Sequence, residues 1–203
     1  MFHVKHEGWD LVDALGLELD TQKLDKLEAF EVLIRERAIP LGMVATADAG
    51  RLRERHINDS LRAATVVSAT DRTAYDLGSG AGLPGVVVAI ACSELRMRLV
   101  ESRRPRAAFL QLVVDRLDLT NTEVTNERVE MLREPVDLCF SRAFARVGVA
   151  WRAADRLLLP GGHLVYFAGE HFDRAELPED VISNLVRTSA LARSGPLVIM
   201  SRQ

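Results

Sequence analysis

The sequence has few of the residues that carry redox or metal chemistry. Only two of its 203 residues are cysteines, Cys92 and Cys139, and each lies in an apolar run outside any CxxC pair. We therefore expect two buried, reduced thiols, with no disulfide, thiol-bound zinc or redox motif. The histidines show no ligand spacing, so we predict no metal.

Lysine and long apolar segments are also scarce. The last lysine is Lys26, and the only tyrosines are Tyr75 and Tyr166. No apolar run approaches the roughly 20 residues of a membrane span, and residues 1–6 lack the apolar stretch of a signal peptide. We expect a cytoplasmic protein without membrane contact, and we predict a monomer.

Charge is distributed unevenly around a net value of −3. Residues 1–50 hold ten acidic against five basic side chains, whereas the remainder holds 21 basic against 19 acidic. Arginines cluster within 51–62, 103–106 and 142–156. Local patches of this kind matter more for binding phosphate than the total charge does.

Hydrophobic spacing divides the chain into a helical beginning and an alternating remainder. Residues 8–37 and 47–67 are predicted to be helical, with Pro40 and Gly42 ending the first segment. From residue 70 strands alternate with helices, which predicts a mostly parallel sheet covered on both faces. The predicted strands are Thr73–Leu77, Met97–Glu101, Glu123–Asn126, Val136–Ser141, His163–Phe167 and Leu197–Ser201, with Leu185–Arg193 as a further edge strand. The predicted helices between them are Pro84–Cys92, Pro105–Leu117 and Gly148–Leu159. Residues 1–69 would form a helical segment packed on a Rossmann-like core of residues 70–203.

The glycine-rich segment that follows the first strand can be read in two registers. Gly80, Gly82 and Gly85 form the GxGxxG of dinucleotide-binding folds. Asp76, Gly78, Gly80 and Gly82 instead resemble motif I of class I methyltransferases, where the acid orients the loop or meets the methionine amino group of S-adenosylmethionine. Either ligand would lie at the carboxyl ends of the strands.

Three further features of the sequence concern the ligand. Glu101 ends the second strand 19 residues after Gly82, where an acid accepts hydrogen bonds from a ribose of either ligand. Leu158-Leu159-Pro160-Gly161-Gly162 resembles the turn before the fifth strand of class I methyltransferases. The tyrosine–lysine pair of common short-chain dehydrogenases is not available after Lys26, so the methyltransferase register is favoured.

Four segments together resemble the glucose-inhibited division protein B family, bacterial methyltransferases of guanine N7 in 16S ribosomal RNA. The segments are Arg55–Leu61 (RHINDSL), Asp76–Gly85 (DLGSGAGLPG), Glu101–Leu110 (ESRRPRAAFL) and Ser141–Phe144 (SRAF). The resemblance implies a seven-stranded sheet with an antiparallel last strand, an N-terminal helical extension, S-adenosylmethionine as cofactor and the small ribosomal subunit as partner. It also implies cofactor contacts from Gly78, Gly80, Leu83, Glu101, Val129, Glu130 and Arg142.

Guanine N7 carries a lone pair and no proton, so it can attack the cofactor's methyl group directly without a general base. The enzyme would then act mainly by positioning the two reactants. Accordingly we assign no catalytic acid or base, and we expect His56, near Asp59, to be structural. The three arginine clusters are candidates for the rRNA backbone.

The chain departs from the family pattern at three places. Ala168 stands where the family usually has a lysine, Pro105 interrupts a basic run, and the stretch from Val186 to Leu197 is short. Three alternatives stay open: a methyltransferase with another acceptor, an NAD-dependent oxidoreductase, and a non-enzymatic RNA-binding scaffold with a degenerate cofactor site.

Overall fold

The computed structural model describes residues 9–191 and 194–203. Seven strands form one sheet in the order β3-β2-β1-β4-β5-β7-β6. The strands are β1 Thr73–Leu77, β2 Arg96–Val100, β3 Thr122–Thr125, β4 Val136–Arg142, β5 Leu158–Phe167, β6 Val181–Val186 and β7 Leu197–Arg202. β1 to β5 pair in parallel, and β7 is antiparallel to both of its neighbours. The predicted seven-stranded sheet with an antiparallel last strand is confirmed.

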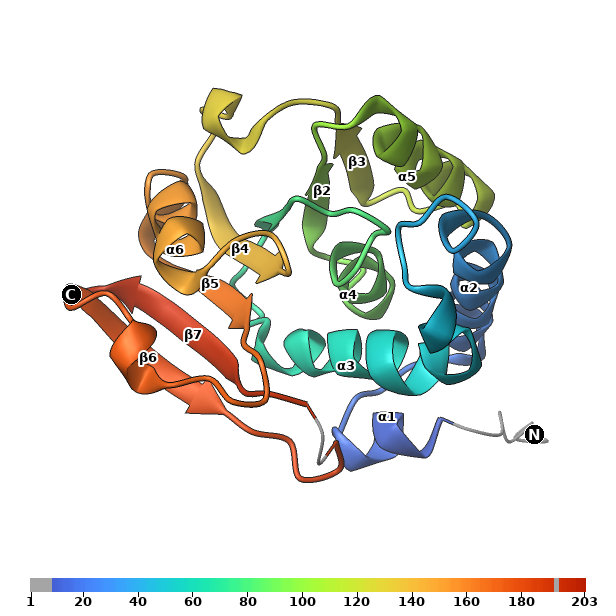
Figure 1. Ribbon diagram of the computed structural model, residues 1–203, viewed down its shortest axis with the longest axis horizontal. Helices are drawn as coiled ribbons and strands as arrows, with labels where there is room; N and C mark the ends of the chain where they lie inside the picture. The colour runs from blue at the N-terminus through green and yellow to red at the C-terminus, as the bar shows by residue number, and fades with distance from the viewer. Residues whose placement is uncertain (1–8, 192–193) are drawn as a thin grey trace.

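Helices cover both faces of this sheet, as Figure 1 shows. The α-helices are α1 Asp10–Ala14, α2 Thr21–Leu33, α3 Asn58–Leu61, α4 Gly85–Ala91, α5 Arg104–Arg116 and α6 Val147–Asp155. Short 3₁₀ or π segments are η1 Ile34–Ala38, η2 Thr46–Arg51, η3 Arg53–Ile57, η4 Arg62–Val66, η5 Val129–Met131 and η6 Arg174–Glu176. In Figure 1, α2, α3, α4 and α5 group on one side of the sheet and α6 lies on the other.

The alternation of side chains along each strand produces two hydrophobic clusters. On β4, Leu138 and Phe140 point into the cluster that contains α2, α4 and α5, whereas Cys139 points into the cluster with α6. Every residue of α4 is buried, as an apolar helix between the sheet and the N-terminal helices requires. The N-terminal residues Leu27 and Phe30 belong to the same cluster as α4, which joins them to the core.

Several element boundaries differ from the prediction. The expected single helix over 8–37 is two helices, because Gly16 takes a positive φ of 67° after α1. Asp20 then starts α2 by accepting a hydrogen bond from the Lys23 amide. Gly8 lies outside the described residues. The expected helix over 47–67 is the continuous series η2, η3, α3 and η4.

Two predictions near the end of the chain were wrong. The segment Leu158–Gly162 belongs to β5, where it bulges between the pairs Val136–Leu158 and Leu138–His163. The edge strand β6 ends at Val186, so only its last two residues overlap the predicted Leu185–Arg193, and residues 192–193 lie outside the described part. Pairing decides this boundary, since Val186 opposes Leu197, the first residue of β7.

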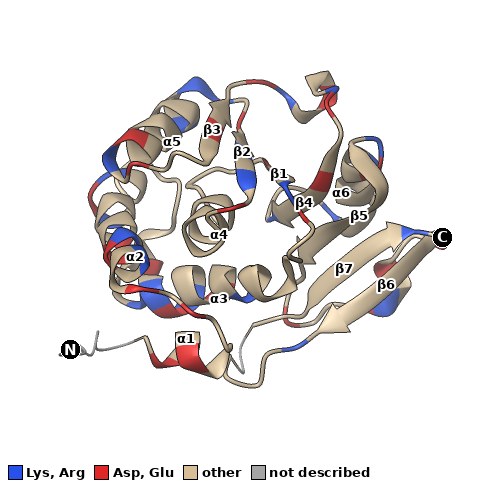
Figure 2. Cartoon of the chain, turned by 180° about the vertical axis from the view of Figure 1, so that it is seen from behind, with Lys and Arg blue, Asp and Glu red and all other residues tan. Residues whose placement is uncertain are grey.

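Charged side chains lie on several of the helices. Figure 2 shows both signs of charge on α2 and on α5, and α1 bears the acidic Asp10 and Asp13. Within residues 9–191 and 194–203, no helix has the length and apolarity needed to cross a bilayer.

Candidate functional site

The glycine loop after β1 is built from left-handed backbone. Gly78, Gly80 and Gly82 have φ values of 71°, 56° and 87°, which side chains with a Cβ rarely adopt. The Ser79 amide donates to the Val100 carbonyl at 2.9 Å, and its hydroxyl donates to the Asp76 carbonyl at 2.9 Å. These bonds tie the loop to the carboxyl end of β2.

Asp76 holds the far end of the loop from inside the core. One carboxylate oxygen accepts the Gly85 amide at 3.0 Å, and burial raises the pKa of Asp76 to about 7. A Cβ on Gly85 would lie 2.6 Å from that oxygen and 2.4 Å from Leu99, so only glycine fits between α4 and the sheet. Of the two roles considered for Asp76, the structure shows the orienting one.

Glu101, the first residue after β2, meets this loop. Its side chain is buried, and its Oε2 accepts the Gly80 amide at 3.1 Å while Oε1 accepts the Arg103 amide at 2.8 Å. The Asn126 side chain donates to the Glu101 carbonyl at 2.8 Å. The carboxylate is therefore fixed in direction, and two backbone donors occupy only part of its four acceptor positions.

A cavity of about 410 Å³ opens beside Glu101, within the size range of small-molecule sites. Its lining residues are Gly78, Val100, Glu101, Ser102, Arg103, Arg106, Glu127, Arg128, Val129, Glu130, Ala143 and Phe144. A smaller cavity of about 220 Å³ lies at the opposite, amino ends of the strands. Only the larger one touches the loops that follow β1, β2 and β4.

The structure brings together most of the site residues expected from the sequence. Gly78, Glu101, Val129 and Glu130 line the cavity, and Gly80 contacts Glu101 through its amide. Leu83 does not line it. Leu83 is only 8% exposed and packs in the cluster around α4, because the loop has already turned into the helix at that point.

The segment η5 presents Val129 and Glu130 to the cavity. Val129 is buried and Glu130 is exposed, so this short helix has one side in the core and one in the cavity. Arg156 donates to the carbonyls of Val129 and Leu132 and thereby holds the segment in place. Nothing in the local sequence around Val129 indicates this support from Arg156, the residue that follows α6.

Ala143 and Phe144 are cavity residues that we did not assign from the sequence. A Cβ added to Gly78 would lie 2.5 Å from the Phe144 ring, so the loop after β4 closes onto the glycine loop. Ala143 has a positive φ of 54°, an uncommon conformation for alanine that often marks functional sites. The sequence feature that could have identified these two residues is the SRAF segment, Ser141–Phe144, which resembles the family.

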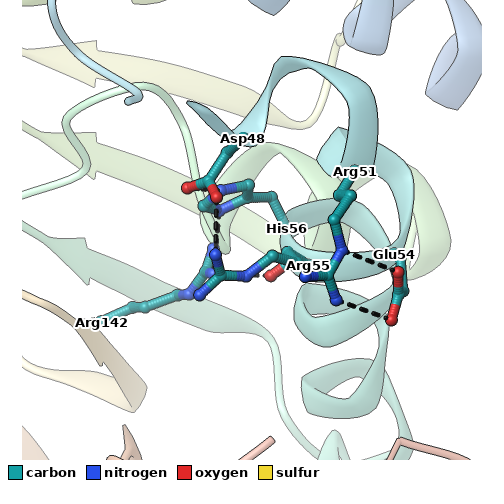
Figure 3. Close-up of polar contacts among 6 residues, drawn as sticks. All are labelled: Asp48, Arg51, Glu54, Arg55, His56 and Arg142. Carbon is teal, nitrogen blue, oxygen red and sulfur yellow. Dashed lines mark hydrogen bonds and ion pairs between the residues drawn. The ribbon is translucent and has the colours of Figure 1, made fainter. Parts of the chain in front are cut away.

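Arg142, at the end of β4, lies outside the cavity lining and turns toward the N-terminal helices. Its Nη2 donates to the Arg55 carbonyl at 3.1 Å, contacts His56 Nδ1 at 3.0 Å and lies 3.4 Å from Asp59 Oδ2. His56 Nε2 in turn contacts Asp48 Oδ2 at 3.0 Å. Figure 3 draws both residues together with Arg55 and Arg142. The carboxylate that contacts His56 is thus Asp48, whereas Asp59 pairs with Arg62 and Arg142.

Arg62 is a buried cation in the same region. It is 2% exposed, donates to Asp59 Oδ1 at 2.5 Å and to the Gly195 carbonyl at 2.9 Å, and lies over the Phe167 ring. The next residue, Ala168, is the position where the family usually has a lysine. A basic group therefore does lie near this turn, supplied by the N-terminal segment.

The strand order, the glycine loop and the buried acid at the end of β2 are those of a class I methyltransferase fold of the S-adenosylmethionine-dependent type. Solved structures agree. A SAM-dependent methyltransferase from Aquifex aeolicus is 15% identical, with a TM-score of 0.57 over 79% of this chain and 97% of that one. A methyltransferase from Geobacter sulfurreducens is 17% identical, with a TM-score of 0.57 over 96% and 94%.

The chain belongs to the GidB family, described as rRNA small subunit methyltransferase G, whose model matches residues 23–190. Relatives named ribosomal RNA small subunit methyltransferase G include that of Ralstonia nicotianae, 36% identical over 82% of this chain and 79% of the relative. The one from Acidiphilium cryptum is 42% identical over 74% and 70%. The resemblance found in the sequence is confirmed.

Proposed function

We propose that this protein transfers the methyl group of S-adenosylmethionine to N7 of a guanine in the small-subunit 16S rRNA. Family membership supports the substrate. The observation that carries the proposal is the meeting of Glu101 with the glycine loop at one cavity, at the carboxyl ends of β1 and β2. A cytoplasmic monomer is the form we expect for such an enzyme.

The residues present fit an adenosyl cofactor. The unoccupied acceptor positions of Glu101 suit two ribose hydroxyls, and Val129 offers an apolar contact for a purine. Glu130 brings a carboxylate to which the adenine amine can donate. Gly78 allows the backbone to approach closely, and Gly80 acts through the direction it gives to Glu101.

S-adenosylmethionine, when bound, supplies a methyl group on a positively charged sulfur. The chain contributes position rather than proton transfer, because the N7 lone pair of guanine needs no base. Arg142 adds a guanidinium at the end of β4, on the side from which an acceptor would approach.

The arginine clusters divide into two groups with respect to RNA binding. Arg51 pairs with Glu54, Arg55 pairs with Asp48, and Arg62 is buried. By contrast, Arg103, from the second cluster, and Arg128, which lies outside the three clusters, line the cavity, are exposed, and make no side-chain hydrogen bond or ion pair with the described residues. We assign the phosphate contacts to this second group, together with the exposed Arg146.

Methyl transfer from labelled cofactor to 30S particles, free 16S RNA and protein extract tests the proposal. We expect label in rRNA, at a base that aniline cleaves after borohydride treatment, as N7-methylguanine does. Calorimetry with S-adenosylhomocysteine should show binding, and NAD should show none. Labelled protein with unlabelled rRNA, or binding of NAD alone, would overturn it.

The phosphate contacts are tested through salt. Each lost phosphate contact should reduce the slope of log affinity against log salt by about 0.7–0.9. We therefore expect a smaller slope for Arg128→Ala and an unchanged slope for Arg51→Ala, the matched control. Equal slopes for both variants would remove Arg128 from the RNA surface.

A further inference from the structure

The guanidinium of Arg142 lies over the Phe167 ring, 5.8 Å from its centroid, and makes hydrogen bonds through only one of its three nitrogens. Among the described residues its hydrogen bonds and ion pair all run through Nη2, to Arg55, His56 and Asp59. Nε and Nη1 have no hydrogen-bond partner among residues 9–191 and 194–203, and neither is fully enclosed there. Three N–H groups of this arginine are thus available to a ligand.

The contact with His56 defines the state of the imidazole. An arginine nitrogen can only donate, so His56 Nδ1 must accept at 3.0 Å, and the ring is neutral with its proton on Nε2. That proton is donated to Asp48 Oδ2 at 3.0 Å, which fixes the tautomer. Figure 3 shows Asp48 and His56, from the helical series of residues 46–66, beside Arg142 from the end of β4. A second proton on the ring would place the N–H of His56 Nδ1 opposite an N–H of Arg142 Nη2, and the two would repel each other.

We propose that His56 is a positioning residue, which holds Arg142 through Nδ1 so that the open edge of the guanidinium donates to an oxygen of the acceptor nucleotide. This rests on the proposed function. Arg142 immediately precedes Ala143 and Phe144, which line the cavity, and it stands at the carboxyl end of β4, the edge of a parallel sheet at which ligands bind. The oxygen is either guanine O6 or a neighbouring phosphate, since a guanidinium donates to both.

The arrangement makes Arg142 sensitive to acid. The charged groups facing His56 are Asp48 from η2, Arg55 from η3 and Arg142 from β4. Burial and the Arg142 charge lower the pKa of His56 from 6.5, against the opposing effect of Asp48. Methyl transfer should therefore be lost as pH falls through a midpoint below 6.5. Asp76, whose pKa is about 7, adds a separate titration.

Three variants separate the two titrations. His56→Asn keeps an acceptor near the Nδ1 position but cannot be protonated, and His56→Ala has no acceptor. His163→Asn is the matched control, because His163 is also half-buried with its pKa lowered by burial but lies in β5. The rate kcat/KM for rRNA is measured from pH 5 to 8, with S-adenosylhomocysteine affinity as the measure of an intact fold.

We expect His56→Ala to lower kcat/KM about tenfold, the loss of one hydrogen bond, with cofactor affinity unchanged. His56→Asn should recover most of that loss and should not lose activity through the titration below pH 6.5. His163→Asn should still show that loss of activity at low pH. An unchanged acid limb in His56→Asn, or full activity in His56→Ala, would overturn the proposal.

Two further measurements distinguish the oxygen and the failure modes. RNA with 2-aminopurine in place of the guanine lacks O6 but keeps N7. On that RNA, Arg142→Gln should have the same kcat/KM as the wild type if Arg142 contacts O6. If Arg142 contacts a phosphate, the variant should lose as much of kcat/KM as it does on native RNA. Full activity of Arg142→Gln on native RNA would overturn the contact. The ¹⁵N resonances of His56 report the tautomer without any activity: a protonated Nδ1 at pH 8 refutes the positioning role, whereas absent rRNA methylation with the expected tautomer refutes the proposed function alone.

Discussion

Replacing Glu101 with glutamine tests the carboxylate at the centre of the site. Its two oxygens each accept one backbone amide, from Gly80 at 3.1 Å and from Arg103 at 2.8 Å. Glutamine keeps one carbonyl oxygen and puts an NH₂ group in place of the other, so one of these amides loses its acceptor. We expect the free energy of unfolding to fall by about 1–3 kcal/mol.

The effect on cofactor binding is of similar size. A ribose hydroxyl bonded to a charged acceptor contributes about 1.5–3 kcal/mol, so affinity for S-adenosylhomocysteine should weaken about 10- to 150-fold at ~1.4 kcal/mol per tenfold. Titration calorimetry measures the affinity, and urea unfolding measures the stability.

Glu127→Gln is the control for this experiment. Glu127 lines the same cavity and carries the same charge, but its carboxylate makes no hydrogen bond to the described residues. Its removal should change affinity by less than about twofold. Our reasoning would be refuted if Glu101→Gln bound the cofactor like the wild type while remaining folded, because the ribose contact would then lie elsewhere.

Three further predictions concern the packing around the site. Gly85→Ala should lower the free energy of unfolding by about 1–3 kcal/mol by overpacking. Gly50→Ala is the control, because no atom lies within 4 Å of its new methyl group. Thermal melts compare the two variants, and equal melting temperatures would contradict the close packing at Gly85. Because burial raises the pKa of Asp76 from 3.8 to about 7, the folded protein keeps a proton that the unfolded chain has lost between these values. Stability relative to Asp76→Asn should therefore fall as pH rises from 4 to 7, by on the order of 4 kcal/mol, and a constant difference in urea unfolding would speak against it. Arg62→Met should cost about 3 kcal/mol by leaving Asp59 without its main partner, and adding Asp59→Asn should restore part of it; a double variant no more stable than Arg62→Met would show that the pair is not the cause.

Local sequence was sufficient for those parts of the fold that depend on local rules. The strands from Thr73 to Phe167 appear as runs with turn residues between them, and their parallel order follows from the helices that connect them. The distance from Gly82 to Glu101 placed the carboxylate beside the loop, because carboxyl ends of adjacent parallel strands share one edge. Conversely, the predicted edge strand was misplaced, since its register depends on pairing with β7.

What the sequence alone determined is the chemistry of the cofactor end: glycines that permit positive φ, and an acid at a strand end, are specified by residues close together in the chain. What only the tertiary structure decided is which charges are available. Arg62 and Arg142 each precede an alanine in the sequence, yet one is buried between Asp59 and Gly195 and the other keeps an open edge. Asp59 and Arg142 form an ion pair although they lie far apart along the chain. The partner of each charged side chain, and hence its role, therefore follows only from how the N-terminal helices pack against the sheet.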